Sequence, residues 1–480
     1  MVGRKGGWTT AAVLAVLAVL AGACGGDDGG GGGAGNGATG DNGDADLRPC
    51  RLDAVEEAAA ADGPVEITMW HGQARVNEEV LIELTDAFNA SQDAVQVQLV
   101  AQPGSGDLMN NMVAGITTGE LPDVAMITDV EQQLAMDTGL ILPAQSCVDA
   151  AGFDLSDFLP QAVEYYTVDG VLQAVPFNVA SPLLLYNKTV FADAGLDPED
   201  PPETLDELHQ MAQTIADAGY EAGFALHRYG WYFEQFMALA GEMYFDNGNG
   251  RQGRADEVVF DNESGRAIFS TISEMLEDGS AVSFPGRGSI DHLTSLGEGL
   301  VGMTMQSSSA LGGVYQALFL EGQYADAEFG VAPLPAPGPA EDGGVVVGGG
   351  ALYIVSGTEP DPATEAAAWR YIEFLSSAES AATWAAGTGY VPVRESAVDQ
   401  PVLQERWAEA PFFRVPYDQL VEGAANEATA GGLHAQMEEV RMVIEDAWRR
   451  MDDEGLPPDE ALEGVVAEAN QVLQDYNARI

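Results

Sequence analysis

The segment Pro176–Lys188, PFNVASPLLLYNK, contains a turn-like start, an apolar run and a lysine at its end. It begins like a turn, because Pro176 and Pro182 both restrict the backbone. The run Leu183–Leu185 is fully apolar, which is typical of a strand that is buried on both faces. The segment then ends on Lys188, in a chain whose other lysine is at position 5. We expect a buried strand that ends at the surface, and a structural role for this lysine.

Strands and helices alternate on the N-terminal side of this segment. Apolar and β-branched patterns predict strands over Val65–Trp70, Val95–Val100 and Asp123–Ile127. The helical spacing of apolar residues predicts helices over Glu78–Asn89 and Met109–Thr117. Such alternation is typical of an α/β domain with a largely parallel sheet.

The alternation continues on the C-terminal side. A capping box, Thr204 with Glu207, predicts a helix that runs to about Asp217. Two glycine-rich strands and two helical blocks are expected further on, within residues 298–313, 343–355, 365–386 and 432–451. We therefore expect an α/β architecture throughout.

The composition excludes some kinds of partner. The chain has 480 residues, of which 46% are hydrophobic, and this length favours a core divided over two or three lobes. Its 76 acidic and 19 basic residues give a formal net charge of -57. Such a charge repels nucleic acid and anionic lipid surfaces and favours a soluble monomer. A polyanionic ligand would need basic residues that gather locally.

The N-terminus has the features of an export signal. The basic pair Arg4-Lys5 precedes the apolar run Ala11–Leu20, which has the length of a signal-peptide core and is too short to span a bilayer. The residues Ala21–Cys24 resemble a bacterial lipobox, although Leu20 stands four residues before the cysteine instead of three. The alternative is an ordinary secretory peptide that is cut near Ala23.

This pattern predicts how the protein is attached to the cell. We expect a signal peptide over 1–23, lipidation of Cys24, and a flexible Gly/Asp-rich linker over 24–49. A lipid anchor would then hold the folded part at the outer face of the bacterial cytoplasmic membrane.

Two further cysteines, Cys50 and Cys147, form an even pair. An exported protein reaches a compartment in which disulfides form, so we expect a bridge between them. Two free, buried thiols are the alternative.

Motifs of common enzymes and metal sites are absent from the sequence. It contains no G-x-x-x-x-G-K-[ST] loop, no H-E-x-x-H, no C-x-x-C and no G-x-S-x-G. The five histidines are scattered without metal-ligand spacing: His71, His209, His227, His292 and His434. We expect no cofactor, no metal and no enzymatic activity, although a carboxylate pair of a glycan-active enzyme could be present among so many acids.

Four segments together resemble one protein family. They are ITMWHGQ (67–73), LPDVAMITDV (121–130), PFNVASPLLLYNKTVFADAGLDPEDPPETLDEL (176–208) and TGYVPVRESA (388–397). These segments are similar to the extracellular solute-binding proteins of bacterial ABC importers that bind carbohydrates, and in particular to the glycerol-3-phosphate-binding branch. The resemblance covers Pro64–Ile480.

The resemblance implies a two-lobed periplasmic-binding-protein-like fold of type II, with a hinge between lobes that each have a central sheet flanked by helices. The chain would cross between the lobes near Asn178–Pro182, return near Gly343–Leu352 and cross again near Gly389–Pro392. The implied divisions are 50–180 and 346–389 for the first lobe, and 181–345 and 390–480 for the second. A monomer that delivers its ligand to the membrane permease is expected.

The resemblance also implies which residues contact the ligand. Asp129 would accept two ligand hydroxyls, and Trp231 would stack on the ligand with Tyr232 and Trp70 as weaker candidates. Further matched positions are Ser181, Ser308, Gly349, Gly350 and Tyr390. The alternatives are that the aromatic residues belong to the core, that Ser308 caps a loop, and that the glycines only form turns.

One position departs from the glycerol-3-phosphate-binding pattern. That branch has a phosphate-binding arginine in a Gly-Leu-Arg stretch, where this chain has Gly432-Leu433-His434 and places Leu433 at the arginine. A buried phosphate needs Arg or Lys partners, and Arg394 or Arg414 could substitute. We therefore expect the ligand to be a neutral mono- or oligosaccharide, with a glycerophosphodiester or glycerol-3-phosphate as the second candidate. The less favoured alternative is that the protein is a secreted enzyme that acts on glycans.

Overall fold

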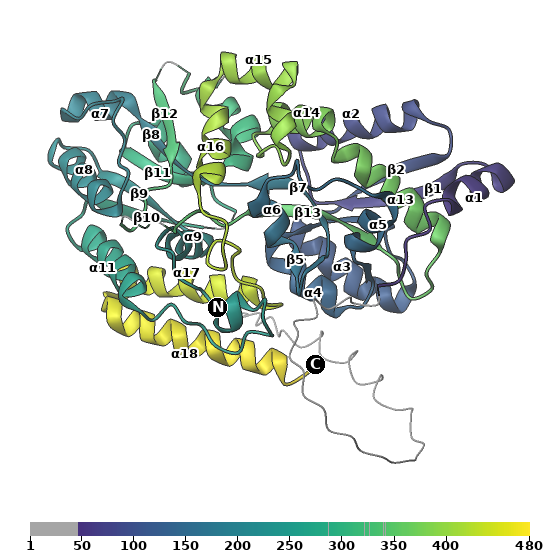
Figure 1. Ribbon diagram of the computed structural model, residues 1–480. Coiled ribbons are helices and arrows are strands. Elements are labelled where there is room, and N and C mark those ends of the chain that lie inside the picture. Colours follow the sequence, from purple (N-terminus) through teal and green to yellow (C-terminus); the bar gives the residue numbers. More distant parts are fainter. Residues whose placement is uncertain (1–46, 287, 321, 326, 339, 341) are drawn as a thin grey trace, which may run out of the picture. The chain divides into compact units, whose positions relative to one another are not determined.

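The computed structural model describes residues 47–480 except 287, 321, 326, 339 and 341 (Figure 1). The expected signal peptide, Cys24 and nearly all of the linker lie outside the described residues. The structural statements below concern the described part of the chain.

The first sheet has the strand order β2-β1-β3-β13-β4, with β7 paired to β13. Its strands are β1 (Val65–His71), β2 (Val95–Ala101), β3 (Val124–Thr128), β4 (Ile141–Leu142), β7 (Val175–Ala180) and β13 (Gly348–Val355). The helices packed on it include α1 (Ala54–Asp62), α2 (Val76–Ser91), α3 (Ser105–Thr118) and α13 (Pro362–Leu375), and α14 (Ala378–Thr388) packs on α2 and α13.

The expectation of a largely parallel sheet holds for only half of this sheet. β1 runs parallel to β2 and β3, whereas β13 runs antiparallel to β3, β4 and β7. The parallel strands are joined by α2 and α3, as in βαβ units. β13 enters the sheet from a distant part of the chain, so no βαβ connection determines its direction.

The second sheet has the order β10-β9-β11-β8-β12. Its strands are β8 (Pro182–Asn187), β9 (Ala222–Arg228), β10 (Ala281–Pro285), β11 (Val301–Ser307) and β12 (Phe329–Pro333). The helices that contact it include α7 (Lys188–Ala194), α8 (Leu205–Asp217), α11 (Glu263–Glu277), α12 (Asp291–Gly297) and α17 (Met437–Glu454), and α18 (Pro458–Asn477) packs on α11 and α17.

Shorter elements connect these parts. They are η1 (Asp129–Glu131), α4 (Gln132–Asp137), α5 (Ala144–Ala151), α6 (Pro160–Tyr165), β5 (Thr167–Val168), β6 (Val171–Leu172), α9 (Trp231–Leu239), α10 (Asp246–Asn249), η2 (Ser308–Ala310), η3 (Leu311–Leu320), η4 (Glu395–Asp399), α15 (Pro401–Glu409), η5 (Pro411–Arg414) and α16 (Val415–Glu422).

Helix ends follow local capping chemistry. The predicted capping box is present, because Thr204 Oγ1 accepts from the Glu207 amide and the Glu207 carboxylate accepts from the Thr204 amide. The block expected at 365–386 is instead two helices, since Ser377 caps a new helix by accepting from the Ser380 amide. The block expected from residue 432 becomes helical only at Met437.

The segment Pro176–Lys188 passes from one sheet to the other. β7 ends at Ala180 in the first sheet and β8 begins at Pro182 in the second, so Ser181 alone separates two strands of different sheets. Pro182 is tolerated because it is the first residue of its strand. Lys188 begins α7, and its Nζ donates to Glu199 at 2.7 Å, which is the structural role expected.

A disulfide joins Cys50 to Cys147, with sulfur atoms 2.09 Å apart, so the expected bridge is present. It fixes the segment before α1 to α5, and both cysteines belong to the buried core. Arg48 holds the same segment from another side, since its guanidinium donates to both carboxylate oxygens of Glu365 on α13. In the described part of the chain, every helix is too short or too polar to cross a membrane.

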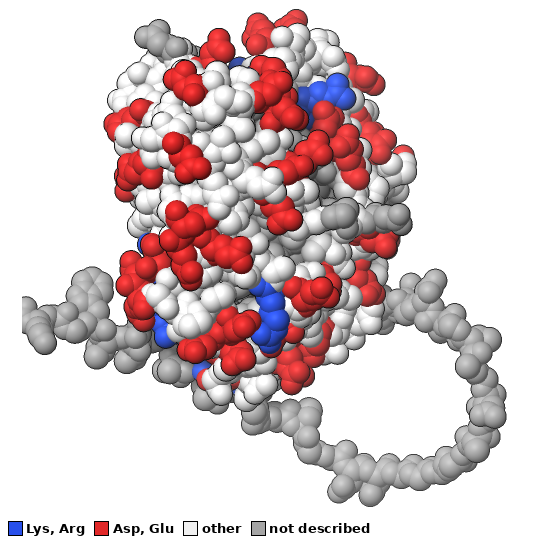
Figure 2. Space-filling model, turned by 90° about the vertical axis from the view of Figure 1, so that its left-hand side faces the viewer, with Lys and Arg blue, Asp and Glu red and all other residues white. Residues whose placement is uncertain are grey.

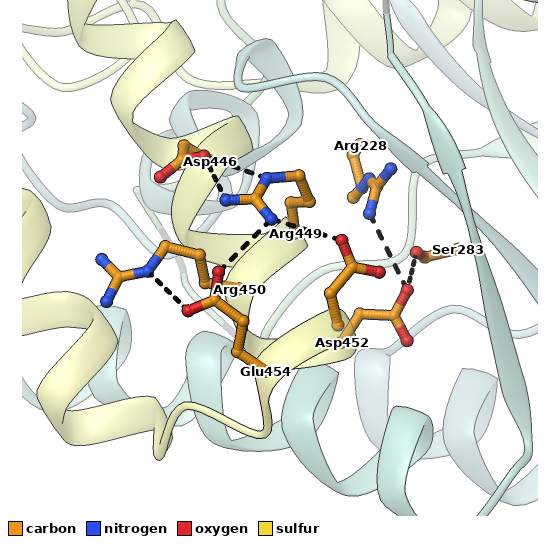
Figure 3. A network of polar contacts seen from close by, with 8 residues as sticks. Arg228, Ser283, Asp446, Arg449, Arg450, Asp452 and Glu454 are labelled. Atoms are coloured by element: carbon orange, nitrogen blue, oxygen red, sulfur yellow. Dashed lines mark hydrogen bonds and ion pairs between the residues drawn. The ribbon is translucent and has the colours of Figure 1, made fainter. Parts of the chain in front are cut away.

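A surface network fixes α17 against the second sheet (Figure 3). The Asp452 carboxylate accepts from Ser283 of β10 and lies 3.8 Å from Nη1 of Arg228, at the end of β9. One turn earlier, Arg449 contacts Asp446 and other acids of the same helix. The Asp452 contacts join α17 to the second sheet, whereas the Arg449 contacts lie within the helix. The other end of α17 carries a buried arginine described below.

Candidate functional site

Three glycines of β13 lie where three strands meet. Gly350 pairs with Thr128 of β3 on one side and with Asn178 of β7 on the other. Gly349 has a φ of +94°, and a Cβ atom built there would lie 1.9 Å from the Asn178 carbonyl oxygen. The register with β7 shifts directly after Gly350. A bulged strand with such close backbone contacts requires glycine here. We call Gly348–Gly350 the glycine run.

Trp231 reaches the glycine run from the side of the second sheet. It is the first residue of α9, which follows β9, and a Cβ atom built on Gly348 would lie 2.6 Å from Cζ2 of its ring. Its side chain is 4% exposed, yet its indole Nε1 has no hydrogen-bond partner among the described residues. The buried Oδ1 of Asn178, on the first sheet, also has none. Two buried polar atoms thus lack a partner along the glycine run, one in the ring beside Gly348 and one beside Gly350.

Asp129 follows β3 and takes part in a buried charge cluster. Nη2 of Arg441, on α17, donates to Asp129 Oδ2 at 2.9 Å and to Glu234 Oε2 at 2.5 Å. Nε of the same guanidinium donates to Glu234 Oε2 at 3.2 Å. All three residues are at most 9% exposed. We call Asp129, Glu234 and Arg441 the charge triad, and it connects the end of a first-sheet strand to two helices of the second sheet.

Burial and neighbouring charges shift the pKa values at the triad. Burial raises the pKa of both Asp129 and Glu234, although Arg441 opposes this shift. Burial also opposes the charge of Arg441, but its two carboxylates outweigh burial and raise its pKa. Burial, together with the charges of Glu438 and Asp129, raises the pKa of Glu131 to about 7 against a hydrogen bond from Thr128. The neighbourhood therefore disfavours further negative charge.

Tyr390 lies beside the crossing segment, because the next residue, Val391, donates its amide to the Val179 carbonyl of β7. Its ring stacks on Trp384 with centroids 5.5 Å apart. Burial raises the pKa of the Tyr390 hydroxyl, whereas hydrogen bonds with Asn178, Gln73 and Ser309 lower it. The hydroxyl is therefore close to groups from both sheets.

Ser181 and Ser308 contact each other at the crossing. The Ser308 amide donates to the Ser181 carbonyl at 2.9 Å, and the Ser181 amide donates to Ser308 Oγ at 3.1 Å. Ser181 Oγ accepts from Gln419 at 2.6 Å. Both serines are fully buried, and these bonds join the chain crossing to the end of β11.

Three other predicted positions have different surroundings. Trp70 lies on β1 and is half-buried against the core of the first sheet. The Tyr232 hydroxyl lies 3.3 Å from His227 Nδ1, in the core of the second sheet. Leu433 is buried, its amide donates to the Asn249 carbonyl, and the preceding amide of Gly432 donates to Glu234. Leu433 thus lies next to the charge triad.

Asn178, Glu234 and Arg441 are not among the ligand-contacting residues that the sequence predicts. A signal for two of them was present. Glu234 is the one acid in the otherwise apolar or uncharged helix Trp231–Leu239. Arg441 falls among Met437, Val440 and Ile444, which helical spacing places on the buried face of α17.

A cavity of about 590 Å³ opens at a different place. Its lining includes Phe158, Val163, Arg251 and Ala430, and it includes none of the predicted ligand-contacting residues. The Arg251 guanidinium at this cavity donates to the backbone carbonyls of Tyr165 and Ala430. We therefore base the candidate site on the unpaired groups at the glycine run and not on this cavity.

Comparison with known proteins identifies the family. The family described as "Bacterial extracellular solute-binding protein" matches residues 83–411, and the chain belongs to this family. It is 27% identical over 426 residues to the sn-glycerol-3-phosphate-binding periplasmic protein UgpB of Escherichia coli (strain K12), covering 87% of this chain and 94% of that protein.

Solved structures share the two-lobed α/β fold, with sheets flanked by helices, that the resemblance implied. The sugar-binding protein MalE from Xanthomonas citri is 20% identical, with a TM-score of 0.70 over 86% of this chain and 98% of that one. UgpB from Mycobacterium tuberculosis in complex with glycerophosphocholine is 20% identical, with a TM-score of 0.69 over 87% and 100%. The cyclic alpha-maltosyl-1,6-maltose binding protein from Arthrobacter globiformis is 23% identical, with a TM-score of 0.68 over 86% and 100%.

Proposed function

We propose that this solute-binding protein captures a neutral sugar or sugar-like polyol between its two lobes and delivers it unchanged to the permease of an ABC importer. The observation that carries the proposal is the pair of unpaired buried atoms at the glycine run, Asn178 Oδ1 and Trp231 Nε1. Leaving each of them unpaired costs about 1–3 kcal/mol. A hydroxyl group can donate to the first and accept from the second, so a polyol satisfies both.

The neighbouring groups suit the same kind of ligand. The indole of Trp231 offers a flat face to the C–H surface of a sugar ring, and Asp129 and Tyr390 offer oxygen atoms to its hydroxyls. The buried serines at the crossing are joined to each other, and we assign them to the hinge.

A neutral ligand fits the charges better than a phosphate. Leu433 is apolar where the glycerol-3-phosphate-binding pattern has arginine, and Arg441 is already bound by two carboxylates. The face shown in Figure 2 carries many acidic and few basic residues, which repels anions at long range. A glycerophosphodiester or glycerol-3-phosphate remains the second candidate, because relatives are named for binding such compounds.

We propose lobe boundaries that follow the strands. The first lobe would comprise 50–180 and 346–389, and the second 181–345 and 390–480. Support comes from Ser181, which separates strands of different sheets, and from β13, which returns the chain to the first sheet.

The first prediction concerns attachment to the cell. Replacing Cys24 with alanine should release the protein into the culture medium, because a linker without acyl chains has nothing to hold it at the bilayer. Membrane and soluble fractions of cells that express each form would be compared by immunoblot. A mutant that stays in the membrane fraction after washing would show that Cys24 is not the anchor.

The second prediction concerns the ligand and Trp231. The full chain would be screened by thermal shift against glucose, maltose, maltotriose, trehalose, glycerol, glycerophosphocholine and sn-glycerol-3-phosphate. A neutral member should raise the melting temperature and be recovered unchanged by mass spectrometry. In Trp231→Ala, calorimetry should show binding weakened by about 1–3 kcal/mol, and Trp231→Phe, which keeps an aromatic face but loses Nε1, should show a smaller loss.

Several outcomes would contradict this second prediction. Equal binding by wild type and Trp231→Ala would exclude Trp231 from the site. If Trp231→Ala is unfolded while Trp231→Phe binds like wild type, Trp231 is a core residue. Conversion of the added sugar would support the glycan-active enzyme instead.

A further inference from the structure

The charge triad occupies the edge of Arg441 that an anion would use. Nε and Nη2 form one edge of the guanidinium, and such an edge binds the two oxygens of a phosphate or carboxylate. In this structure both nitrogens donate to Glu234 Oε2, and Nη2 also donates to Asp129. An incoming oxyanion would have to displace a carboxylate and leave it buried without its partner.

The charges around Arg441 add to this barrier. One guanidinium faces two carboxylates within the triad, and the charge of Glu438 on α17 acts on both Asp129 and Glu131 of η1. The triad itself lies in a buried region where charges are poorly screened. An anion that approaches Arg441 would therefore meet the carboxylates of Asp129 and Glu234, whereas a hydroxyl ligand would not be repelled.

Glu234 is held in place independently of Arg441. Its Oε1 accepts from the Gly432 amide at 3.3 Å, and it lies three residues after Trp231 on the same face of α9. The backbones of α9 and α17 are also in close contact, because a Cβ atom built on Gly230 would lie 2.3 Å from the Arg441 carbonyl oxygen. A glutamine at position 234 keeps the acceptor oxygen and the size of the side chain, so it removes mainly the charge.

We propose that Glu234 determines the charge selectivity of the ligand site: by occupying Arg441, it closes the site to anions and leaves it to uncharged polyols. This inference deepens the proposed function and rests on it. When the charge of Glu234 is removed, Arg441 becomes available for an oxyanion beside the glycine run, and the same site accepts anions.

The test uses sulfate, which keeps its charge over the working pH range, as the anion. Titration calorimetry on the full chain should show that Glu234→Gln binds sulfate at least about tenfold more tightly than wild type, because Arg441 gains a free edge. Asp129→Asn removes the other carboxylate from Arg441 and should also increase sulfate affinity. The matched control is Glu242→Gln, a half-buried acid near the end of α9 that accepts from Asn262 and Ser264.

The outcomes separate this inference from the proposed function. If Glu234→Gln and Asp129→Asn, both folded by circular dichroism, bind sulfate no better than Glu242→Gln, the selectivity role of Glu234 is refuted. The same holds if wild type already binds sulfate as tightly as Glu234→Gln. If no neutral compound of the panel stabilises wild type, the proposed function fails, whatever the sulfate result.

Discussion

Replacing Arg441 with methionine should lower the free energy of unfolding by about 3–5 kcal/mol, because it leaves two buried carboxylates without their shared partner. Methionine has a similar length, so the loss of the charge is the main change. Without Arg441, the folded pKa values of Asp129 and Glu234 rise further above their unfolded values. At a pH below the unfolded pKa values both carboxyl groups are protonated and burying them costs little. As the pH rises, the unfolded state releases these protons more readily than the folded state, so stability is lost, and the effect of the mutation should be larger at pH 8 than at pH 5.

Urea unfolding of three variants at both pH values checks this result. Arg449→Met is the matched control, because Arg449 lies on the same helix with 39% of its side chain exposed, and its solvent-screened ion pairs with Asp446 and Glu454 should contribute little to stability. Adding Glu234→Gln to Arg441→Met should recover part of the lost stability. A loss in Arg441→Met no larger than in Arg449→Met would contradict the buried triad.

The second large effect is expected from the disulfide. Replacing both Cys50 and Cys147 with alanine should destabilise the protein by about 4–5 kcal/mol, because the bridge spans 97 residues and restricts the unfolded chain strongly. Both side chains are buried in the core of the first sheet, so alanine also removes packing there. Denaturant unfolding of the double variant and of wild type measures the difference.

A second comparison separates the bridge from other contacts of the N-terminal segment. Arg48→Met removes the ion pair with Glu365 but leaves the disulfide, and a partly exposed pair of this kind contributes about 1 kcal/mol. A cysteine double variant whose stability falls by no more than that of Arg48→Met would show that the bridge contributes little.

The strands and helices could be predicted from local patterns. The strands over Val65–His71 and Val95–Ala101 agree with the alternation and β-branched residues of the sequence, and the capping box fixed the start of α8. The direction of β13 could not be read locally, because it depends on which distant strand it meets. The break at Ser376-Ser377 was missed, since the apolar spacing on both sides continues through it.

The sequence predicts part of the candidate site, including two residues at the ends of secondary-structure elements. Asp129 and Trp231 lie directly after a strand and at the start of a helix, where ligand-contacting side chains are often placed. The triad joins residues 312 and 207 positions apart along the chain. Local sequence patterns cannot predict contacts between residues so far apart. Glu234 in an apolar helix and Arg441 on a buried helix face each indicated that a charged partner was needed, but not which one.

A crystal structure of the protein, grown with the panel compound that raises its melting temperature most, tests the central claim most directly. We expect a neutral sugar at the glycine run, with hydroxyls within hydrogen-bonding distance of Asn178 Oδ1 and Trp231 Nε1 and with the Arg441–Glu234 pair intact. A ligand in the cavity beside Arg251, or a phosphate bound by Arg441, would contradict the account.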